Sequence, residues 1–272
     1  MTALPDHCVG CCRHPRPSVG VVRWAAIVIL VAAWLPVACS RYAPPEIQPD
    51  PRADRIVAAL GQANADLTGF KCLGRVTLSG LDRPVASFRA AMAGRSPTRL
   101  RIDMIAPYGG ASGTLAADGQ YLFLVRHAAG EYLKKRLGDG SLQRVLDMDV
   151  GVDDLLELLM GRIPIDGACQ PRMGSGNGEN GIQIDLIDRR GRLCQRIWSD
   201  AALQPVRSEW YDDQQRLMHA ASLDGHQRID GFALPMQIEL SGRSGVRLQV
   251  ALERYEPNAG LPEAVFTPDR LE

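Results

Sequence analysis

The sequence has no excess of charge of either sign, because 31 basic residues balance 31 acidic ones. Residues 1–38 carry three arginines and one aspartate, which leaves the rest of the chain near a net charge of minus two. Proteins that bind nucleic acid carry a basic surface that neutralises phosphates. The balance therefore gives no reason to expect a nucleic-acid partner.

The chain also lacks the residue spacings that metal sites and hydrolases require. After residue 38 no His-x-x-x-His or Cys-x-x-Cys pair occurs, and no Gly-x-Ser-x-Gly element is present. Asp153, Asp154 and Glu157 lie beside leucines, and this spacing is typical of the solvated face of a helix. We therefore expect a protein that is not an enzyme and that holds no metal and no cofactor.

Cysteine is scarce beyond residue 39, where only Cys72, Cys169 and Cys194 occur. An odd number permits one disulfide at most, and Cys169 and Cys194 bracket a stretch that reads as a loop. A buried free thiol is an equally good interpretation for each cysteine. The sequence leaves both alternatives open.

No apolar run is long enough to span a membrane, which takes ~20 residues. The longest runs from Trp24 to Leu35, after several arginines and before small residues and Cys39. This order predicts a secretory signal over residues 1–38, and the alternatives to a lipoprotein signal are an ordinary cleaved signal and an uncleaved N-terminal anchor. A cysteine at this point resembles the lipobox of bacterial lipoproteins, which implies cleavage before Cys39 and its acylation. Residues 39–52 hold four prolines and predict an extended tether.

In the remainder, residues 53–272, apolar side chains are spaced as in helices over two segments and as in strands over many more. Residues 53–66 and 141–161 space their apolar side chains as helices do. Between them, residues 99–106 alternate apolar and polar side chains, and Asp118-Gly119 indicates a hairpin. Further strands are predicted over these segments: 69–80, 85–92, 113–118, 120–127, 131–136, 182–186, 193–198, 206–211, 217–223, 232–240 and 246–252.

Two segments interrupt or follow these strands. Residues 167–181 are rich in glycine and predict a surface loop, and the tail is expected to pack Val265 and Phe266 onto the body. No parallel βαβ unit is visible. The fold class is therefore mainly β (α+β): a strongly curved antiparallel sheet or incomplete β-barrel, with helices covering the open side.

The order of short motifs in the middle of the chain resembles the LolB-like outer-membrane lipoproteins of the LolA/LolB group. Pro107-Tyr108-Gly109 ends a strand, Asp118-Gly119 turns a hairpin, and Gly130-Glu131-Tyr132 begins another strand. An apolar helix and Gly161-Arg162-Ile163-Pro164 follow. The detailed likeness covers roughly 65 residues, and the lipobox-like Cys39 agrees with it.

The resemblance implies a lipid-anchored protein on the periplasmic face of the outer membrane. There it would accept acyl chains of lipids or lipoproteins from a LolA-like periplasmic carrier and help deliver them to the membrane. Ser40 after Cys39, in place of aspartate, agrees with the outer membrane. Tyr108 stands where the family places an exposed leucine thought to contact the membrane, and tyrosine also suits a lipid–water interface.

The expected ligand site is a dry cavity, although the sequence leaves open which face of each strand lies inward. Its candidate lining residues are apolar: Leu100, Ile102, Met104, Leu122, Leu124, Leu155, Leu159, Trp198 and Trp210. The alternative is a structural or assembly lipoprotein of an envelope complex, with a filled core and no lipid ligand.

Overall fold

The structure is a computed structural model, and it describes residues 49–80, 83–138, 142–143, 147–175 and 181–268. These residues lie within one compact unit, Pro44–Glu272. The predicted signal, Cys39 and most of the predicted tether lie outside the described residues. Within them, no helix is sufficiently long and apolar to cross a membrane.

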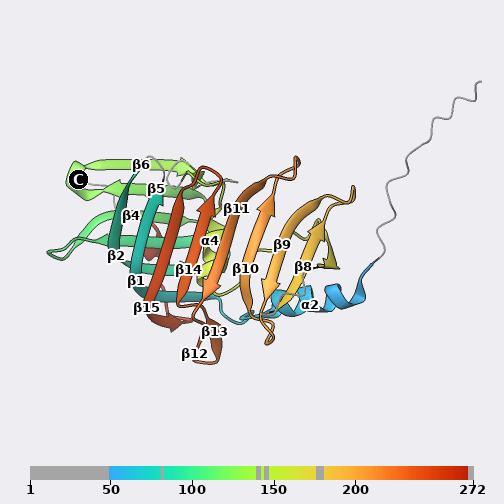
Figure 1. Ribbon diagram of the computed structural model, residues 1–272. Helices are drawn as coiled ribbons and strands as arrows, with labels where there is room; N and C mark the ends of the chain where they lie inside the picture. Colours follow the sequence, from blue (N-terminus) through green and yellow to red (C-terminus); the bar gives the residue numbers. More distant parts are fainter. Residues whose placement is uncertain (1–48, 81–82, 139–141, 144–146, 176–180, 269–272) are drawn as a thin grey trace, which may run out of the picture. The chain divides into compact units, whose positions relative to one another are not determined.

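An antiparallel sheet, with thirteen strands in the described residues, dominates the unit (Figure 1). It is strongly curved and is not closed into a barrel, which confirms the predicted fold class. Its strands, in spatial order, are β6 (Glu131–Arg136), β5 (Tyr121–Arg126), β4 (Ala111–Asp118), β3 (Arg99–Ile105), β2 (Arg83–Arg95), β1 (Gly69–Gly80), β15 (Arg247–Pro257), β14 (Gln237–Gly242), β11 (Leu217–Asp224), β10 (Pro205–Tyr211), β9 (Leu193–Ser199), β8 (Ile182–Ile187) and β7 (Gln170–Met173).

The pairing of β1 with β15 joins two meanders that are distant in sequence. Val76 lies opposite Val250, and Leu78 lies opposite Leu248. Because opposite residues of an antiparallel pair share a face, these side chains point to the same side of the sheet. The first and last strands among the described residues thus lie side by side at the centre of the sheet.

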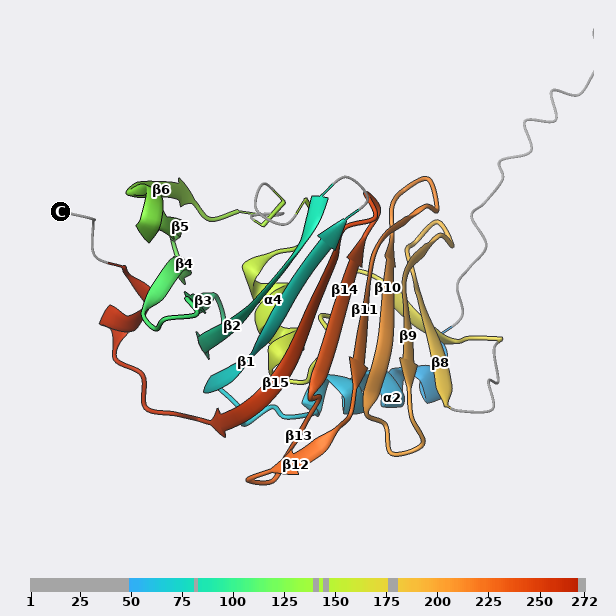
Figure 2. The same ribbon diagram turned by 60° about the vertical axis from the view of Figure 1, so that its left-hand side comes forward.

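Two described α-helices lie on one face of the sheet (Figure 2): α2 (Pro51–Gln62) and α4 (Val152–Leu159). Helix α2 begins at Pro51, two residues before the predicted start, because Oδ1 of Asp50 accepts hydrogen bonds from the N–H groups of Arg52 and Ala53. Proline suits the first helical position, where no N–H partner is needed. Helix α4 lies within the predicted helical segment, and Gly161 follows it with φ +72°.

The main core lies between this face and the two helices. Ile56 and Leu60 of α2 and the leucines of α4 pack against inward-facing strand residues. In β15 the alternate residues Leu248, Val250 and Leu252 are all buried, as its period of two predicts. One continuous apolar core therefore joins both halves of the sheet.

The opposite face of the sheet carries a small second cluster. Phe266 of η2 (Glu263–Phe266) is buried with Leu261 and Ala93 of β2. Because Ala93 follows Met92, which belongs to the main core, the two side chains point to opposite faces. The predicted packing of the tail onto the body is confirmed.

The two edges of the sheet differ. At the β7 edge, Oδ2 of Asp50 accepts the N–H of Met173 at 3.0 Å, and α2 lies beside the strand. At the other edge, β6 has no further strand beside it among the described residues. A side chain and a helix thus occupy one edge, and the other is open.

The structure corrects two predicted segments. The predicted loop over residues 167–181 contains β7, a short polar strand paired with β8. The predicted strand over residues 232–240 is two strands, β13 (Phe232–Leu234) and β14, and β13 forms a separate ribbon with β12 (Gln227–Ile229). Pro235 separates them, because proline has no N–H to donate to a strand ladder.

The structure also decides between the alternatives for the cysteines. Cys169 and Cys194 form a disulfide, which ties the start of β7 to β9. Cys72 is a free thiol buried in the core, and burial raises its pKa.

Candidate functional site

An apolar pocket lies between α4 and the inward face of the sheet. Its volume is about 150 Å³, and no polar residue contributes to its wall. The lining residues are Val76, Leu78, Phe88, Met92, Ile102, Met104, Leu115, Leu124, Leu155, Leu159, Leu248 and Val250. Such a lining favours an apolar occupant, because a water molecule would find no hydrogen-bond partner there.

Strand register brings these residues together. Ile102 of β3 lies opposite both Met92 of β2 and Leu115 of β4, and Leu115 lies opposite Leu124 of β5. Each of these four residues is therefore on the inward face. Leu155 and Leu159 are one helical turn apart, so α4 presents both to the sheet.

Five of the nine predicted cavity residues line this pocket: Ile102, Met104, Leu124, Leu155 and Leu159. Leu100 and Leu122 are buried in the same core without reaching the pocket wall.

The two predicted tryptophans do not line the pocket. Trp210 is half-buried against the core and stacks on His219, with ring centroids 4.6 Å apart. Trp198 points to the opposite face from its buried neighbour Ile197, beside the guanidinium groups of Arg196 and Arg207. The predicted placement of Trp198 in the cavity is therefore wrong. The error arose because this strand carries apolar residues on both of its faces.

Sequence reasoning missed seven lining residues, which come mostly from β1, β2 and β15. They are Val76, Leu78, Phe88, Met92, Leu115, Leu248 and Val250. Their alternation predicts strands correctly, but it does not reveal that β15 pairs with β1. The pocket depends on that long-range pairing.

The C-terminal end of α4 is firmly attached to neighbouring segments. Arg162 binds Glu157 through Nε and Nη2, and its Nη1 donates to the carbonyl oxygens of Asn64 and Leu67 at 3.1 Å. The hydroxyl of Tyr255 donates to the carbonyl of Leu159 at 3.2 Å, and burial raises the pKa of this tyrosine. These bonds fix α4 to the segment before β1 and to β15.

The N-terminal end of α4 has a local cap. Oδ2 of Asp154 accepts the N–H of Gly151 at 2.9 Å. Burial raises the pKa of Asp154 despite this bond. The described hydrogen bonds to distant segments are therefore concentrated at the other end of the helix.

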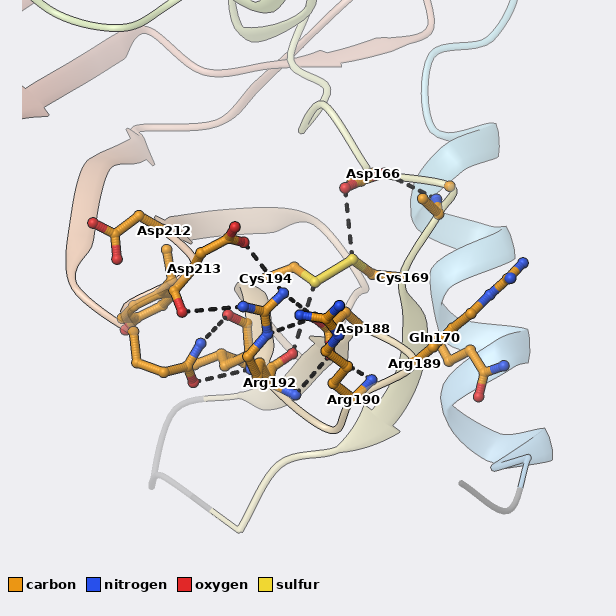
Figure 3. Close-up of a pocket in the computed structure, with 15 residues that line it drawn as sticks. Asp166, Cys169, Gln170, Asp188, Arg189, Arg190, Arg192, Cys194, Asp212 and Asp213 are labelled. Carbon is orange, nitrogen blue, oxygen red and sulfur yellow. Dashed lines mark hydrogen bonds and ion pairs between the residues drawn. A yellow bond between two sulfur atoms is a disulfide. The ribbon is translucent and has the colours of Figure 1, made fainter. Parts of the chain in front are cut away.

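A larger hollow of about 690 Å³ lies on the surface near the disulfide (Figure 3). Its wall includes the Cys169–Cys194 bond, the β8–β9 turn and the β10–β11 turn. Figure 3 shows Asp188 and Arg192 facing each other at the β8–β9 turn, with Asp213 beside them. The wall is thus polar and charged, unlike the pocket under α4.

Two carboxylates of this surface hollow accept hydrogen bonds from residues of their own turns. Asp188 accepts the N–H groups of Arg190 and Arg192 at 2.8 and 2.9 Å, and these bonds lower its pKa. Hydrogen bonds from Arg216, first from its backbone and then from its side chain, lower the pKa of Asp212 to about 2. Both groups are therefore ionised at neutral pH. Across the described part of the chain, no three His, Cys, Asp or Glu side chains converge as metal ligands would.

Tyr108 lies at the tip of the loop between β3 and β4 and is fully exposed. The two glycines that follow it have φ values of +88° and +77°, a region that favours glycine. The loop closes through the Ala106 N–H, which donates to the carbonyl of Gly110 at 3.0 Å. A compact turn therefore presents the tyrosine ring to its surroundings.

Comparison with known proteins gives a likeness of fold. A LolA superfamily protein from Nitrosomonas europaea matches with a TM-score of 0.55 and 16% identity, over 80% of this chain and 99% of that one. The fold of this chain is therefore similar to that of a LolA superfamily protein. A putative outer membrane lipoprotein-sorting protein domain from Vibrio parahaemolyticus gives a TM-score of 0.58 at 12% identity, over 79% and 96% of the two chains.

A third solved structure is also similar to this chain. A DUF1329 family protein from Desulfovibrio piger matches with a TM-score of 0.59 and 13% identity, over 81% of this chain and 98% of that one. No protein-family profile matches the sequence, and no curated protein matches it. The resemblance predicted from the motif order is thus confirmed at the level of the fold.

Proposed function

We propose that this chain binds the acyl chains of lipids or lipoproteins in the pocket under α4 and helps deliver them to the outer membrane. The observation that carries the proposal is the pocket itself, whose twelve lining residues are all apolar. Burying an alkyl chain there contributes about 0.8 kcal/mol per methylene group. The proposed activity is binding and transfer, without catalysis.

Two further observations support an envelope location. Disulfides such as Cys169–Cys194 persist in oxidising compartments, and the bacterial periplasm is one. The similar solved structures include a LolA superfamily protein and a putative lipoprotein-sorting domain. We place the protein on the periplasmic face of the outer membrane, anchored through an acylated Cys39, with a LolA-like carrier as its donor.

The size of the pocket sets a condition on binding. Its volume of about 150 Å³ is below the ~300–1,000 Å³ of typical ligand pockets. The pocket therefore takes in only part of a long acyl chain unless α4 moves away from the sheet. Because α4 is held at its C-terminal end by Arg162 and Tyr255, we expect its N-terminal end to move.

The small volume also agrees with the alternative function. A structural lipoprotein of an envelope complex would have a filled core, and the buried apolar residues of the described part of the chain do form one large cluster. Such a protein would act through its surface and would carry no lipid. Uptake of an acyl ligand distinguishes the two functions.

The test is native mass spectrometry of the purified full-length protein, followed by titration with a fluorescent fatty acid. We expect a co-purifying acyl lipid or saturable uptake of the probe. Leu124→Trp should reduce uptake, because the larger ring occupies the pocket. Leu217→Trp is the matched control, since Leu217 is exposed on β11 and lies outside the pocket.

The two proposed functions predict different results in this test. Loss of uptake in Leu124→Trp with retention in Leu217→Trp supports binding in this pocket, provided that both variants keep the melting temperature of the parent. A protein that carries no lipid and takes up no probe contradicts the proposal and favours the structural alternative.

A further inference from the structure

A continuous row of apolar side chains leads from the pocket to the open edge of the sheet. Cross-strand partners define it, with one residue on each strand from β2 to β6. We call it the exit row, and its members are Met92, Ile102, Leu115, Leu124 and Leu133.

The last residue of the exit row is its most exposed member. Met92 is buried with 3% of its surface exposed, Leu124 is half-buried, and Leu133 at the end is 55% exposed. Four of the five residues line the pocket, and Leu133 is the next neighbour of Leu124. A partly exposed leucine that continues a buried row is a suitable surface for the part of an acyl chain that does not fit inside.

Cationic side chains flank the end of this row on the same face. Lys135 lies opposite Leu122 and Arg126 lies opposite Glu131, so all four share the inward face with Leu133. Arg126 forms an ion pair with Glu131. Lys135 is exposed and has no ion-pair or hydrogen-bond partner among the described residues.

The opposite face of β6 is organised differently. There the ammonium group of Lys134 lies 3.9 Å from the centroid of the Tyr121 ring, which it contacts through a cation–π interaction. The two consecutive lysines therefore have different surroundings, and only Lys135 shares a face with the exit row.

We propose that the β6 edge is the portal of the pocket and that it selects ligands with an anionic head group. The acyl chain lies along the exit row, and its carboxylate or phosphate lies beside Lys135. This inference rests on the proposed acyl binding and adds the route of entry and the charge of the ligand. The carboxylate of a fatty acid and the phosphate of a lipid share the chemistry that Lys135 recognises.

The test compares three amphiphiles with one alkyl chain and different heads: dodecanoate, dodecyl phosphate and dodecyltrimethylammonium. Their affinities are measured below micelle formation by displacement of a fluorescent fatty acid from the full-length protein. We expect both anionic ligands to bind about fivefold more tightly than the cationic one at low salt, with the difference decreasing as salt is added. A difference between dodecanoate and dodecyl phosphate identifies the preferred source of the anion.

The variant Lys135→Gln should reduce the anionic preference about threefold, and Lys135→Glu should reverse it. Lys134→Gln is the matched control and should keep the preference, because this lysine points to the other face. Leu133→Asn should weaken all three ligands alike.

The results distinguish this inference from the function on which it rests. If all three amphiphiles bind with equal affinity, or if Lys135→Gln and Lys134→Gln behave alike, the portal assignment is overturned and acyl binding stands. If none of the three binds to the parent protein, the proposed function and the portal fail together.

Discussion

Arg162 and Glu157 form a two-point ion pair, in which Nε and Nη2 of the arginine each lie 2.6 Å from a carboxylate oxygen. Only 11% of the arginine side chain is exposed. The remaining nitrogen binds two carbonyl oxygens before β1, so one side chain joins the end of α4 to the start of the sheet.

Removal of this arginine should destabilise the protein substantially. We expect Arg162→Met to lower the free energy of unfolding by about 2–4 kcal/mol, because it leaves a partly buried carboxylate and two carbonyls without their donor. Arg162→Lys should not restore the loss, since a lysine cannot form the planar two-point contact. Urea unfolding measures both changes.

The matched control for Arg162 is Arg89→Met. Arg89 pairs with Glu253 at 2.6 Å, but half of its side chain is exposed. Exposed pairs contribute about 0–1 kcal/mol. Equal losses in the two variants would show that burial of the Arg162 pair has no special effect.

Acid should weaken the β10–β11 turn. Hydrogen bonds from Arg216 lower the pKa of Asp212 to about 2 in the folded protein, from an ordinary value of 3.8. The unfolded chain therefore binds more protons in this range, and stability is lost as pH falls from about 4 to about 2. Asp212→Asn should show a shallower decline of melting temperature over this interval.

Asp213→Asn provides the comparison for the acid experiment, because it removes one negative charge from the same turn. Asp213 has a side chain that is 90% exposed. If this variant and Asp212→Asn decline with the same slope, the acid sensitivity does not arise from the hydrogen-bonded carboxylate of Asp212.

Reduction of the disulfide should loosen the β7 edge. Cys169 and Cys194 are 25 residues apart, and closing a loop of this length stabilises a fold by about 3 kcal/mol. We expect dithiothreitol and the Cys169→Ser/Cys194→Ser variant to lower the melting temperature by the same amount. Cys72→Ala is not an equivalent change, since Cys72 packs in the core.

Substitution of Tyr108 should affect transfer to membranes without affecting the fold. Its ring is fully exposed between Pro107 and two glycines. Tyr108→Glu should slow the delivery of bound lipid to vesicles, because a carboxylate enters the lipid interface at a high cost. Tyr108→Trp should preserve delivery, since tryptophan also favours the interface. Unchanged transfer by Tyr108→Glu would exclude a membrane contact by this loop.

The strands were the most predictable part of the fold. In β15, Leu248, Val250 and Leu252 alternate with exposed residues, and the structure buries all three. The sequence could not show that β15 pairs with β1, because a period of two carries no information about the partner strand. For this reason the predicted residues that do line the pocket come only from β3, β5 and α4.

The errors have local causes. Ile197 and Trp198 are adjacent and both apolar, so alternation could not assign the inward residue, and the structure buries Ile197. Strand β7 contains Pro171 and polar neighbours, which are typical of a loop, and it forms where β8 and the disulfide hold it. Pro235 directly follows β13, and in the sequence alone it already indicates that a strand ends there.

The difference between the two edges of the sheet limits how copies of this protein can associate. A sheet with two open edges can add neighbours on both sides and grow into an endless ribbon. Here Asp50 and α2 occupy the β7 edge, so strand pairing through β6 would stop at a pair of molecules. The consecutive Lys134, Lys135 and Arg136 oppose even that pair by charge repulsion. Even at high concentration, copies of this protein therefore do not polymerise through the sheet.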